Sequence, residues 1–518
     1  MNAAKVVFPL PKGPRIFPPD SKFGSPGIFR PPLGSSPSKG GVRPGGAEET
    51  FVVQERSDRQ QGRGVVKRRA ALVVLTTSFI VLAMVLTVQS MARSKAHRSA
   101  EFLGDAEANA RQLVMAGRQI FRFDTFGDEA FWGGQLQLHQ AVATLSPRQA
   151  LGLGLKVDAQ ALPPQVIDAV RRGRIDLDDP AVTLELIQHR AVLGVVGFFN
   201  PDGTLRSIGL TCAVCHSTVD NSVAFGIGER IDGLANRDLN VGAIAAAAPN
   251  LQPVVDVLTI VDAKLDATKV RRIFNSWGPG KFDAELFLDG KAFQPDGRSA
   301  ATLIPNARGL AGFNLHTWTG GWGTVPYWNA FVAVNEMHGV GTFFDERLDD
   351  ARQFPIAAAL RLGHVSTDPD TDQVTSKLPA LHFYQLALPP VKPRPGIDFD
   401  PERAERGDEL FSGKANCNRC HREPLWTEPG WNQHAAEELK IDSFEADRSP
   451  GHAYKTMNLA GIFVRERGLF MRAENKGRFY HDGRFPTLLD VVESYNDRFK
   501  LGLGEQEKLD LVEYLKSL

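Results

Sequence analysis

The spacing of hydrophobic and polar positions predicts helices over much of the chain beyond residue 100. Several stretches there repeat apolar residues at helical spacing, and none of appreciable length alternates as a half-buried strand does. Proline in a first turn, and Asp400 before Pro401, mark helix starts because such a proline loses no hydrogen bond and the aspartate accepts one. We therefore expect a mainly α fold with long loops and helices over Asp105–Phe121, Pro163–Arg172, Pro180–His189, Glu402–Phe411 and Glu505–Leu518.

The first part of the chain has a different pattern, in which a polar tail precedes one long apolar run. Residues 1–69 begin with a segment dense in Pro, Gly and Ser and hold 13 Lys or Arg against 5 Asp or Glu, so we predict a disordered cytoplasmic tail. The run at 70–88 carries no charge. A helix of its length spans roughly 30 Å, the thickness of a bilayer core. We predict a transmembrane anchor at 70–92, with a buried core helix as the alternative.

The charges beside this run predict its orientation. Basic residues at 67–69 favour a cytoplasmic N-terminus and export of everything that follows. Residues 90–92, Ser-Met-Ala, resemble a signal-peptidase site, so cleavage is an alternative that also leaves the body exported. The expected location is the inner membrane, single-pass, with the body in the periplasm.

A proline-rich stretch suggests that the exported part has two domains. Such a stretch is stiff and extended, so we place a linker at 389–400 between an N-terminal domain at 93–388 and a C-terminal domain at 401–518. The whole chain has a net charge of +0; because the tail holds +8 and residues 70–92 none, the body sums to −8. An acidic body argues against nucleic-acid binding and is compatible with a basic redox partner.

All four cysteines of the chain belong to two copies of the motif C-x-x-C-H. Two thiols one helical turn apart can add to the two vinyl groups of a haem, and the adjacent histidine then lies beneath the iron as its proximal ligand. A redox disulfide or half a zinc site is the alternative for a single copy. Two copies in an exported chain favour two covalently bound haem c groups, held by Cys212, Cys215, His216, Cys417, Cys420 and His421, with both histidines as metal ligands.

With these motifs, the chain resembles the bacterial di-haem cytochrome c peroxidase superfamily, which includes the methylamine-utilisation enzyme MauG. The resemblance is best over about 302–339 and 405–518, and residues 100–210 match nothing that we can assign. It implies two cytochrome c-like domains, with a first haem that reacts with peroxide and a second haem that transfers electrons.

The resemblance also implies a far-side ligand for the second haem. The segment 479–492 is similar to a family segment, Y-x-H-D-G followed by T-L and V-V, whose histidine precedes this ligand by fourteen residues. The family commonly has methionine there and MauG has tyrosine; the position here is Tyr495. A phenolate would stabilise high-valent iron and lower the reduction potential. His481 and Met457 are alternative ligands, and a tyrosine merely packed with its hydroxyl bonded is a further alternative.

In the first domain, the segment 305–321 is similar to a family segment whose tryptophan lies between the two haems. Trp318 fits this place, with Trp322 as the alternative. Eighteen residues after Trp318, Glu336 resembles the distal glutamate of the family, although the family gap is about two residues longer. An exposed helix glutamate is the alternative for Glu336.

The stretch after the first motif lacks the usual haem ligands. No histidine occurs between His216 and His316, and no methionine before Met337, so the removable histidine of many family members is missing, as in MauG. We predict a first haem held on the protein side by His216 alone, unless His316 or His338 folds over the iron.

These features predict a periplasmic, peroxidase- or MauG-like oxidoreductase. Hydrogen peroxide would react opposite His216 with Glu336 as general acid–base, and charge would pass through Trp318 towards Tyr495, with a periplasmic redox protein as electron partner. Two alternatives stay open. One is an O₂-dependent dioxygenase similar to the bacterial rubber oxygenases, whose motifs also lie far apart; the other is a non-catalytic electron carrier. A Ca²⁺ ion between the domains is also left open.

Overall fold

A computed structural model describes residues 63–518, with side chains at 82–91 and 101–518. Contacts divide the chain into Met1–Met91 and Ala92–Leu518. Most of the predicted tail lies outside the described residues, and the predicted anchor at 70–92 lies in α1 (Arg63–Phe123), mostly without described side chains. No helix among the described residues is both long enough and apolar enough to span a bilayer. The tail and the anchor stay predictions.

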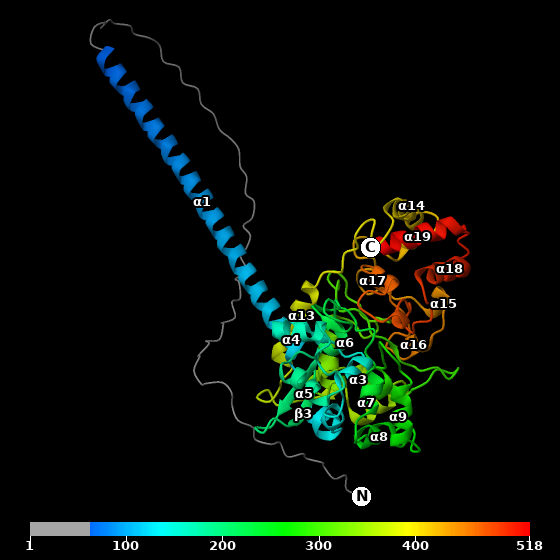
Figure 1. Ribbon diagram of the computed structural model, residues 1–518. Helices are drawn as coiled ribbons and strands as arrows, with labels where there is room; N and C mark the ends of the chain where they lie inside the picture. The colour runs from blue at the N-terminus through cyan, green and yellow to red at the C-terminus, as the bar shows by residue number, and fades with distance from the viewer. Residues whose placement is uncertain (1–62) are drawn as a thin grey trace. The chain divides into compact units, whose positions relative to one another are not determined.

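Residues 92–518 form a mainly helical body, as predicted (Figure 1). The elements before residue 400 are short, and two of them, η1 (Ala130–Gln135) and η3 (Val332–Glu336), are π-helical turns. The α-helices in this part are α2 (Leu138–Val142), α3 (Pro147–Gly152), α4 (Pro164–Arg171), α5 (Pro180–Gln188), α6 (Ala213–His216), α7 (Val241–Ala246), α8 (Gln252–Leu258), α9 (Ala267–Asn275), α10 (Leu286–Asp289), α11 (Val325–Phe331), α12 (Pro355–Leu360) and α13 (Leu378–Ala387). The 3₁₀ turns in this part are η2 (Ala159–Ala161), η4 (Glu346–Asp349) and η5 (Thr375–Lys377).

The described strands pair two by two, which the sequence did not predict. The longest pair is the antiparallel hairpin of β2 (Val195–Phe199) and β3 (Leu205–Leu210), which leads into the first cysteine motif. The other strands have two or three residues, too few for an alternating pattern to be visible in the sequence. They form the pairs β1 (Val157–Asp158) with β5 (Ile227–Gly228), β4 (Ser217–Val219) with β6 (Arg230–Asp232), β7 (Lys281–Phe282) with β8 (Thr302–Leu303), and β9 (Phe343–Phe344) with β10 (His364–Val365).

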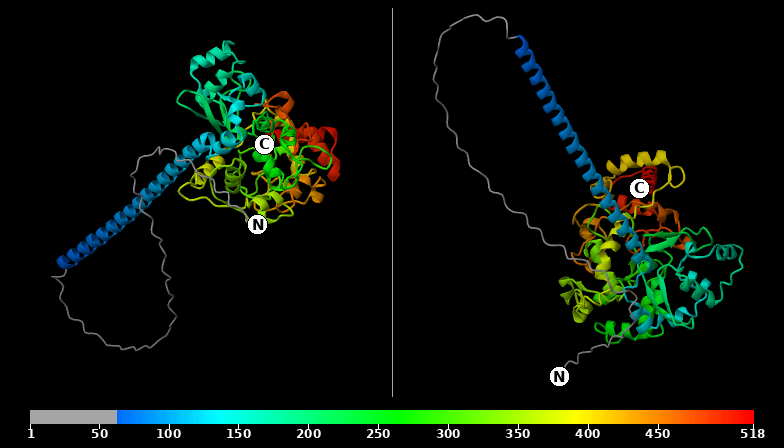
Figure 2. Two further views of the ribbon diagram at one scale, coloured as in Figure 1. Left: turned by 90° about the horizontal axis from the view of Figure 1, so that it is seen from below. Right: turned by 90° about the vertical axis from the view of Figure 1, so that its left-hand side faces the viewer.

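The C-terminal residues, coloured from yellow to red, lie together in the body (Figures 1 and 2). Their helices are α14 (Pro401–Ser412), α15 (Ala436–Leu439), α16 (Phe444–Asp447), α17 (Phe463–Arg467), α18 (Leu488–Phe499) and α19 (Glu505–Ser517), with the 3₁₀ turns η6 (Cys417–Arg419) and η7 (Ala473–Asn475). By their contacts with one another, residues 92–518 form one compact unit. The linker at 389–400 and the domain limits on either side of it therefore stay predictions.

The predicted helices are confirmed, four of them with ends within one residue and the fifth as part of α1. The start of α14 shows why Asp400 and Pro401 predict a helix start correctly. The Asp400 carboxylate accepts hydrogen bonds from the backbone N–H groups of Glu402 and Arg403, and Pro401 occupies the first turn, where its missing donor costs nothing.

Helices α14 and α19, the first and the last helix after the predicted linker, cross closely. A Cβ atom on Gly407 of α14 would lie 2.2 Å from the Asp510 carbonyl and 2.6 Å from the Tyr514 Cβ, so only glycine permits this approach. Arg403 and Arg406 bind the Asp510 carboxylate at 2.9 and 2.8 Å across the same crossing. The two helices therefore hold each other against the core beneath the motif.

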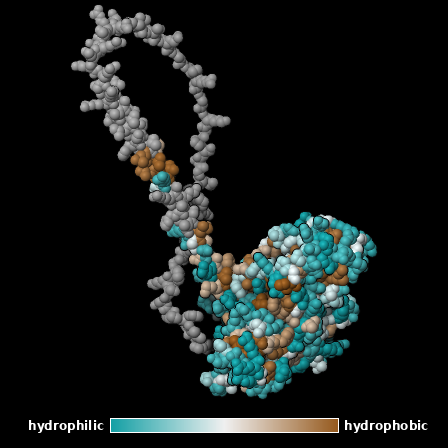
Figure 3. Space-filling model, turned by 45° about the horizontal axis from the view of Figure 1, so that its top comes forward, coloured by the Kyte–Doolittle hydropathy of each residue, from teal (hydrophilic) through white to brown (hydrophobic). Residues whose placement is uncertain are grey.

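One buried ion group joins the two parts of the body. The Arg448 guanidinium donates to Asp289 at 2.8 and 3.0 Å and to Asp283 at 2.9 Å, and all three side chains are fully buried. On the outside, the face drawn in Figure 3 is mainly hydrophilic on the body, with hydrophobic residues in patches between.

The helix crossing gives a stability prediction. Gly407→Ala should destabilise the holoprotein by about 1–3 kcal/mol, because the methyl group meets backbone and Cβ atoms that cannot move aside without separating the helices. Denaturant unfolding followed by circular dichroism measures the change. Gly152→Ala, on α3 with no heavy atom within 4 Å of the added carbon, is the matched control and should be neutral or stabilising. Equal midpoints for the two variants would contradict the prediction.

Candidate functional site

A single cavity among the described residues reaches both cysteine motifs. Its volume is about 1070 Å³, at the upper limit of the roughly 300–1,000 Å³ of ordinary small-molecule sites, and its lining is mostly apolar. The fold therefore brings motifs 205 residues apart to one chamber, which Cys212, Cys215, His216, Cys417, Cys420 and His421 all line.

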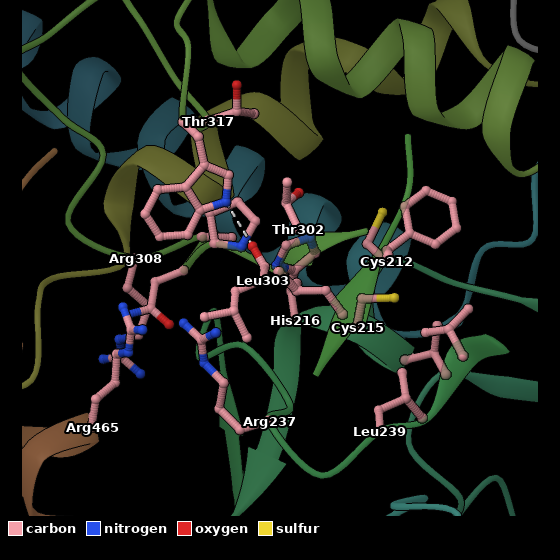
Figure 4. Close-up of a pocket in the computed structure, with 18 of the residues that line it drawn as sticks. Cys212, Cys215, His216, Arg237, Leu239, Thr302, Leu303, Arg308, Thr317 and Arg465 are labelled. Carbon is pink, nitrogen blue, oxygen red and sulfur yellow. Dashed lines mark hydrogen bonds between the residues drawn. The ribbon is translucent and has the colours of Figure 1, made fainter. Parts of the chain in front are cut away.

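The first motif follows the β2–β3 hairpin directly, so the hairpin positions it. Thr211 donates its backbone N–H to the Gly194 carbonyl at the base of the hairpin. Figure 4 shows Cys212 and Cys215 beside His216 on the cavity wall. Burial raises the pKa of each of these thiols to about 12, so both are neutral. A redox-active pair needs a stabilised thiolate, and these surroundings oppose one.

His216 is buried in the same wall. Burial lowers its pKa to about 4, so the imidazole is neutral, the form that binds a metal. The Pro305 carbonyl lies near the ring and acts in the opposite direction, but Nδ1 makes no hydrogen bond of normal geometry. The ring is thus a free, neutral ligand.

The second motif spans η6 and holds its histidine more firmly. His421 Nδ1 lies 3.0 Å from the Trp426 carbonyl, which leaves Nε2 as the free ring nitrogen. A ligating histidine commonly donates its other ring N–H to a carbonyl in this way, and the bond fixes both tautomer and ring orientation. Burial again lowers the pKa of the imidazole.

The second motif also belongs to a cluster with metal-ligand chemistry. Cys420, Glu428 and His434 place one ligand atom each within 4.8 Å of one another, the one such group among the described residues. A structural zinc site would use both thiols of the motif, yet Cys417 is not part of the group. The sulfur of Cys420 and the nitrogen of His434 do not suit Ca²⁺, which prefers oxygen ligands. The Ca²⁺ site between the domains therefore stays a prediction.

Three guanidinium groups near the first motif have no carboxylate partner. Arg237 and Arg465 line the cavity (Figure 4), and each has a buried nitrogen without a hydrogen bond. Burial lowers the pKa of both, to about 9 for Arg465, and the nearby Arg478 lowers each further. Buried cations need anions. The two propionates of a haem would supply them, so these residues fit the cofactor that the motifs predict.

Glu336 ends the π-helical turn η3 and lines the cavity. Its carboxyl group is close enough to Cys215 to disfavour ionisation of that thiol, and its Oε1 atom is buried with no hydrogen-bond partner. Burial raises its pKa well above the usual range, and the neighbouring Glu285 and Asp283 raise it further. The exposed-helix alternative therefore does not describe this residue. Irregular π turns often occur at functional sites.

Trp318 and Trp322 differ in position. Trp318 lines the cavity, and its indole N–H donates to the Leu303 carbonyl at 2.7 Å. Leu303 N–H in turn donates to the His481 carbonyl at 2.7 Å, so Trp318 lies at the junction between the motif-bearing parts. Trp322 is instead buried in a hydrophobic cluster with Phe331 and Phe354.

Tyr495 of α18 lines the cavity near the second motif. Burial raises its pKa well above the usual range, as do the nearby Tyr480 hydroxyl and the Cys417 thiol, so the free phenol is neutral and ligation would have to displace its proton. His481 and Met457 line the same cavity, with His481 stacked on Tyr454 at 5.3 Å. The Met457 backbone lies beside His421.

The two histidines that could close the first site lie in different places. His338 is exposed, stacks on Phe131 at 3.7 Å and is not part of the cavity lining. His316 is buried in the lining beside Lys455, a neighbour that it shares with His421. Of the two, only His316 lines the cavity, and its neighbours place it on the side of the second motif.

Sequence reasoning missed several residues of the lining. Arg237, Arg465, Glu285 and Glu445 belong to no motif, and Trp328 was not singled out although its buried indole N–H has no partner. No local signal marks an arginine or glutamate that long-range packing will bury.

Comparisons with known proteins give a partial link. No family profile matches the chain. Over 149 residues the chain is 30% identical to the cytochrome-c peroxidase IdrP1 of Denitromonas iodatirespirans, a match that covers 22% of this chain and 40% of that protein. Among solved structures, hydrazine synthase of Kuenenia stuttgartiensis matches 44% of this chain and 75% of that chain, at 20% identity and a TM-score of 0.25. The chain thus covers less than half of its peroxidase relative, and the similarity supports an oxidoreductase.

The assignment of Tyr495 gives a spectroscopic prediction. Tyr495→Phe should change the electron paramagnetic resonance signal of one haem and raise its reduction potential, because a phenolate stabilises the oxidised metal and phenylalanine offers no ligand. Tyr454→Phe, which removes another hydroxyl from the lining, should leave both unchanged and serves as the control. If His481→Gln alters the spectrum and Tyr495→Phe does not, the histidine is the ligand.

Proposed function

We propose that this protein is a di-haem c-type oxidoreductase that reduces hydrogen peroxide. The observation that carries the proposal is one cavity lined by both C-x-x-C-H motifs and by a buried, unpartnered glutamate. Partial similarity to a cytochrome-c peroxidase supports the same reaction class. Overall, one peroxide, two protons and two electrons would give two molecules of water.

The residues divide into those that hold the cofactors and those that act on the substrate. Each pair of motif thiols would form two thioether bonds, and His216 and His421 would ligate the irons. Arg237 and Arg465 would neutralise propionates of the first haem. When bound, a haem supplies the redox chemistry by which the O–O bond of peroxide is cleaved.

Glu336 handles the proton. Because burial keeps its carboxyl group protonated, it can donate a proton to the departing peroxide oxygen, and only after that donation can the carboxylate accept another proton. General acid catalysis of this kind typically contributes about 10²–10⁴-fold. Trp318, whose indole N–H donates to the Leu303 carbonyl on the cavity wall, would pass charge towards Tyr495.

The proposed setting is the periplasm, with attachment to the inner membrane through residues 70–92 and electrons from a periplasmic redox protein. The basic segment before an uncharged run and the need of haem c attachment for export support this setting.

One observation favours a second candidate, a dioxygenase that uses O₂ on an apolar substrate. The cavity continues beyond the motifs among apolar side chains of α2 to α5, including Leu138, Leu151, Val166 and Leu186. Helix α4 has no fully buried residue, and its Val166 and Val170 line the cavity as well as packing against a hydrophobic cluster.

Mass spectrometry of protein matured in a periplasm competent for haem attachment tests the proposal first. Two added haems are expected, and removal of both thiols of one motif should leave one. Fewer than two haems in the unmodified protein would end the proposal. Consumption of peroxide with a reduced cytochrome, compared with O₂ uptake on an apolar substrate, separates the two candidates.

Glu336→Gln gives the sharpest functional test. It should slow the reaction with peroxide by about 10²–10⁴-fold while both haems stay attached, because the amide keeps the shape but has no acidic proton. Stopped-flow absorbance with peroxide measures the rate. Glu346→Gln, an exposed glutamate ten residues on, is the control and should react as the unmodified protein does. Equal rates for both variants would remove Glu336 from the mechanism.

A further inference from the structure

Glu336 belongs to a group of buried acidic side chains. Haem attachment does not require acidic residues at these positions. The group has five carboxyl groups, and four of them, all but that of Glu336, interact with a single guanidinium, Arg448. Glu336 interacts with two of the four. Two of the five come from the loop before α10, one from its last residue, one from η3 and one from α16, which lies beyond the predicted linker. They are Asp283, Glu285, Asp289, Glu336 and Glu445.

Two of the five are held as a fixed ion group. Arg448 binds Asp289 through two hydrogen bonds of 2.8 and 3.0 Å and Asp283 through one of 2.9 Å. The hydrogen bonds of Arg448 to carboxylates thus go to these two, whereas Glu285 and Glu445 feel its charge without a hydrogen bond to it.

The other three carboxyl groups line the cavity. Glu285 accepts a hydrogen bond from the Trp322 indole N–H at 3.1 Å. Glu336 Oε1 and Glu445 Oε2 are buried without any hydrogen-bond partner. Glu445 is only 4% exposed. Two buried oxygens without a hydrogen-bond partner, in residues that line the same cavity, are better explained by exchangeable protons than by structural bonds.

Charge balance disfavours ionisation of these three groups. The one positive charge of the group, on Arg448, is already bound by Asp283 and Asp289. Each further ionisation would add a like charge in a poorly solvated site. Burial raises the pKa of Glu285 to about 7, against the opposing effect of Arg448 and with that of Asp283 and Asp289. The pKa values of Glu336 and Glu445 are raised well above the usual range.

A protonated Glu336 can donate one proton. It can act again only after another group has given it a new proton. Glu285 interacts with both Glu336 and Glu445 and is the member whose protonation changes near neutral pH. An acid–base group works best when its pKa is near the working pH.

We propose that Glu285 is the proton-exchange partner of Glu336, with Glu445 behind it as the next member of a carboxyl relay. This inference rests on the proposed peroxidase function. For each peroxide, Glu336 gives its proton to the departing oxygen, Glu285 restores it, and Glu445 restores Glu285; two protons enter from solvent and two electrons from the redox partner. Glu285 and Glu445 are positioning residues because they act through Glu336.

The relay is tested first without turnover. Infrared spectra of the holoprotein in H₂O and D₂O should show a protonated-carboxyl band that disappears as the pH rises through about 7, because Glu285 then loses its proton. Glu285→Gln should remove this titrating band, and Glu346→Gln should keep it. A band that titrates unchanged in Glu285→Gln overturns the inference.

The second arm measures the reaction with peroxide against pH. Glu285→Gln should slow it by about 10–100-fold and abolish its dependence on pH near 7, with Glu285→Asp restoring both in part. Haem content and circular dichroism verify folding. A slower rate that keeps the original pH profile would mean a structural role and overturn the relay. If the unmodified protein ignores peroxide, the proposed function fails, and the infrared arm still decides whether Glu285 holds the exchangeable proton.

Discussion

The buried guanidinium of Arg448 is the constraint on which the rest of the body depends. It lies on the C-terminal side of the predicted linker, whereas Asp283 and Asp289 lie on the other side. Removing one member of a buried ion pair costs about 3–5 kcal/mol, because the remaining charge has no solvent. Further contacts across the linker position agree with this arrangement, including the bonds of Asn475 and of the Arg472 backbone N–H to the Asp238 carboxylate, at 2.7 and 2.9 Å. These contacts join the part of the body that holds the first motif to the part that holds the second, and both motifs line one cavity.

Burial shifts the pKa values of the basic and the acidic residues of this cavity in opposite directions. On the basic wall, Arg237 and Arg465 face the cavity with no carboxylate partner, so burial favours their neutral forms and an anionic ligand would relieve the cost. On the acidic wall, burial favours protonated Glu336 and Glu445. The Arg237 and Arg465 wall therefore suits the carboxylates of a cofactor, and the Glu336 and Glu445 wall favours bound protons. The same desolvation produces both properties because the two walls carry charges of opposite sign.

Much of the helical structure could be predicted from local sequence. Helix α14 begins where Asp400 and Pro401 predict because capping is an interaction between near neighbours in the chain. The β2–β3 hairpin was missed because both of its strands are short and its pairing depends on the partner strand rather than on a pattern within either one. The π turn that carries Glu336 has no sequence signal of its own, and neither does the close crossing at Gly407.

The sequence by itself determined the chemistry of attachment: two thiols and a histidine at fixed spacing predict haem whatever surrounds them, because the thiols and the proximal ligand are neighbours in one turn. Only the tertiary structure decided which isolated residues join that chemistry. It placed Trp318 rather than Trp322 on the cavity, and it buried Arg237 and Glu285 there. Arginine and glutamate are usually solvated, and what makes these two unusual is the loss of water caused by residues distant in the chain, which no local pattern records.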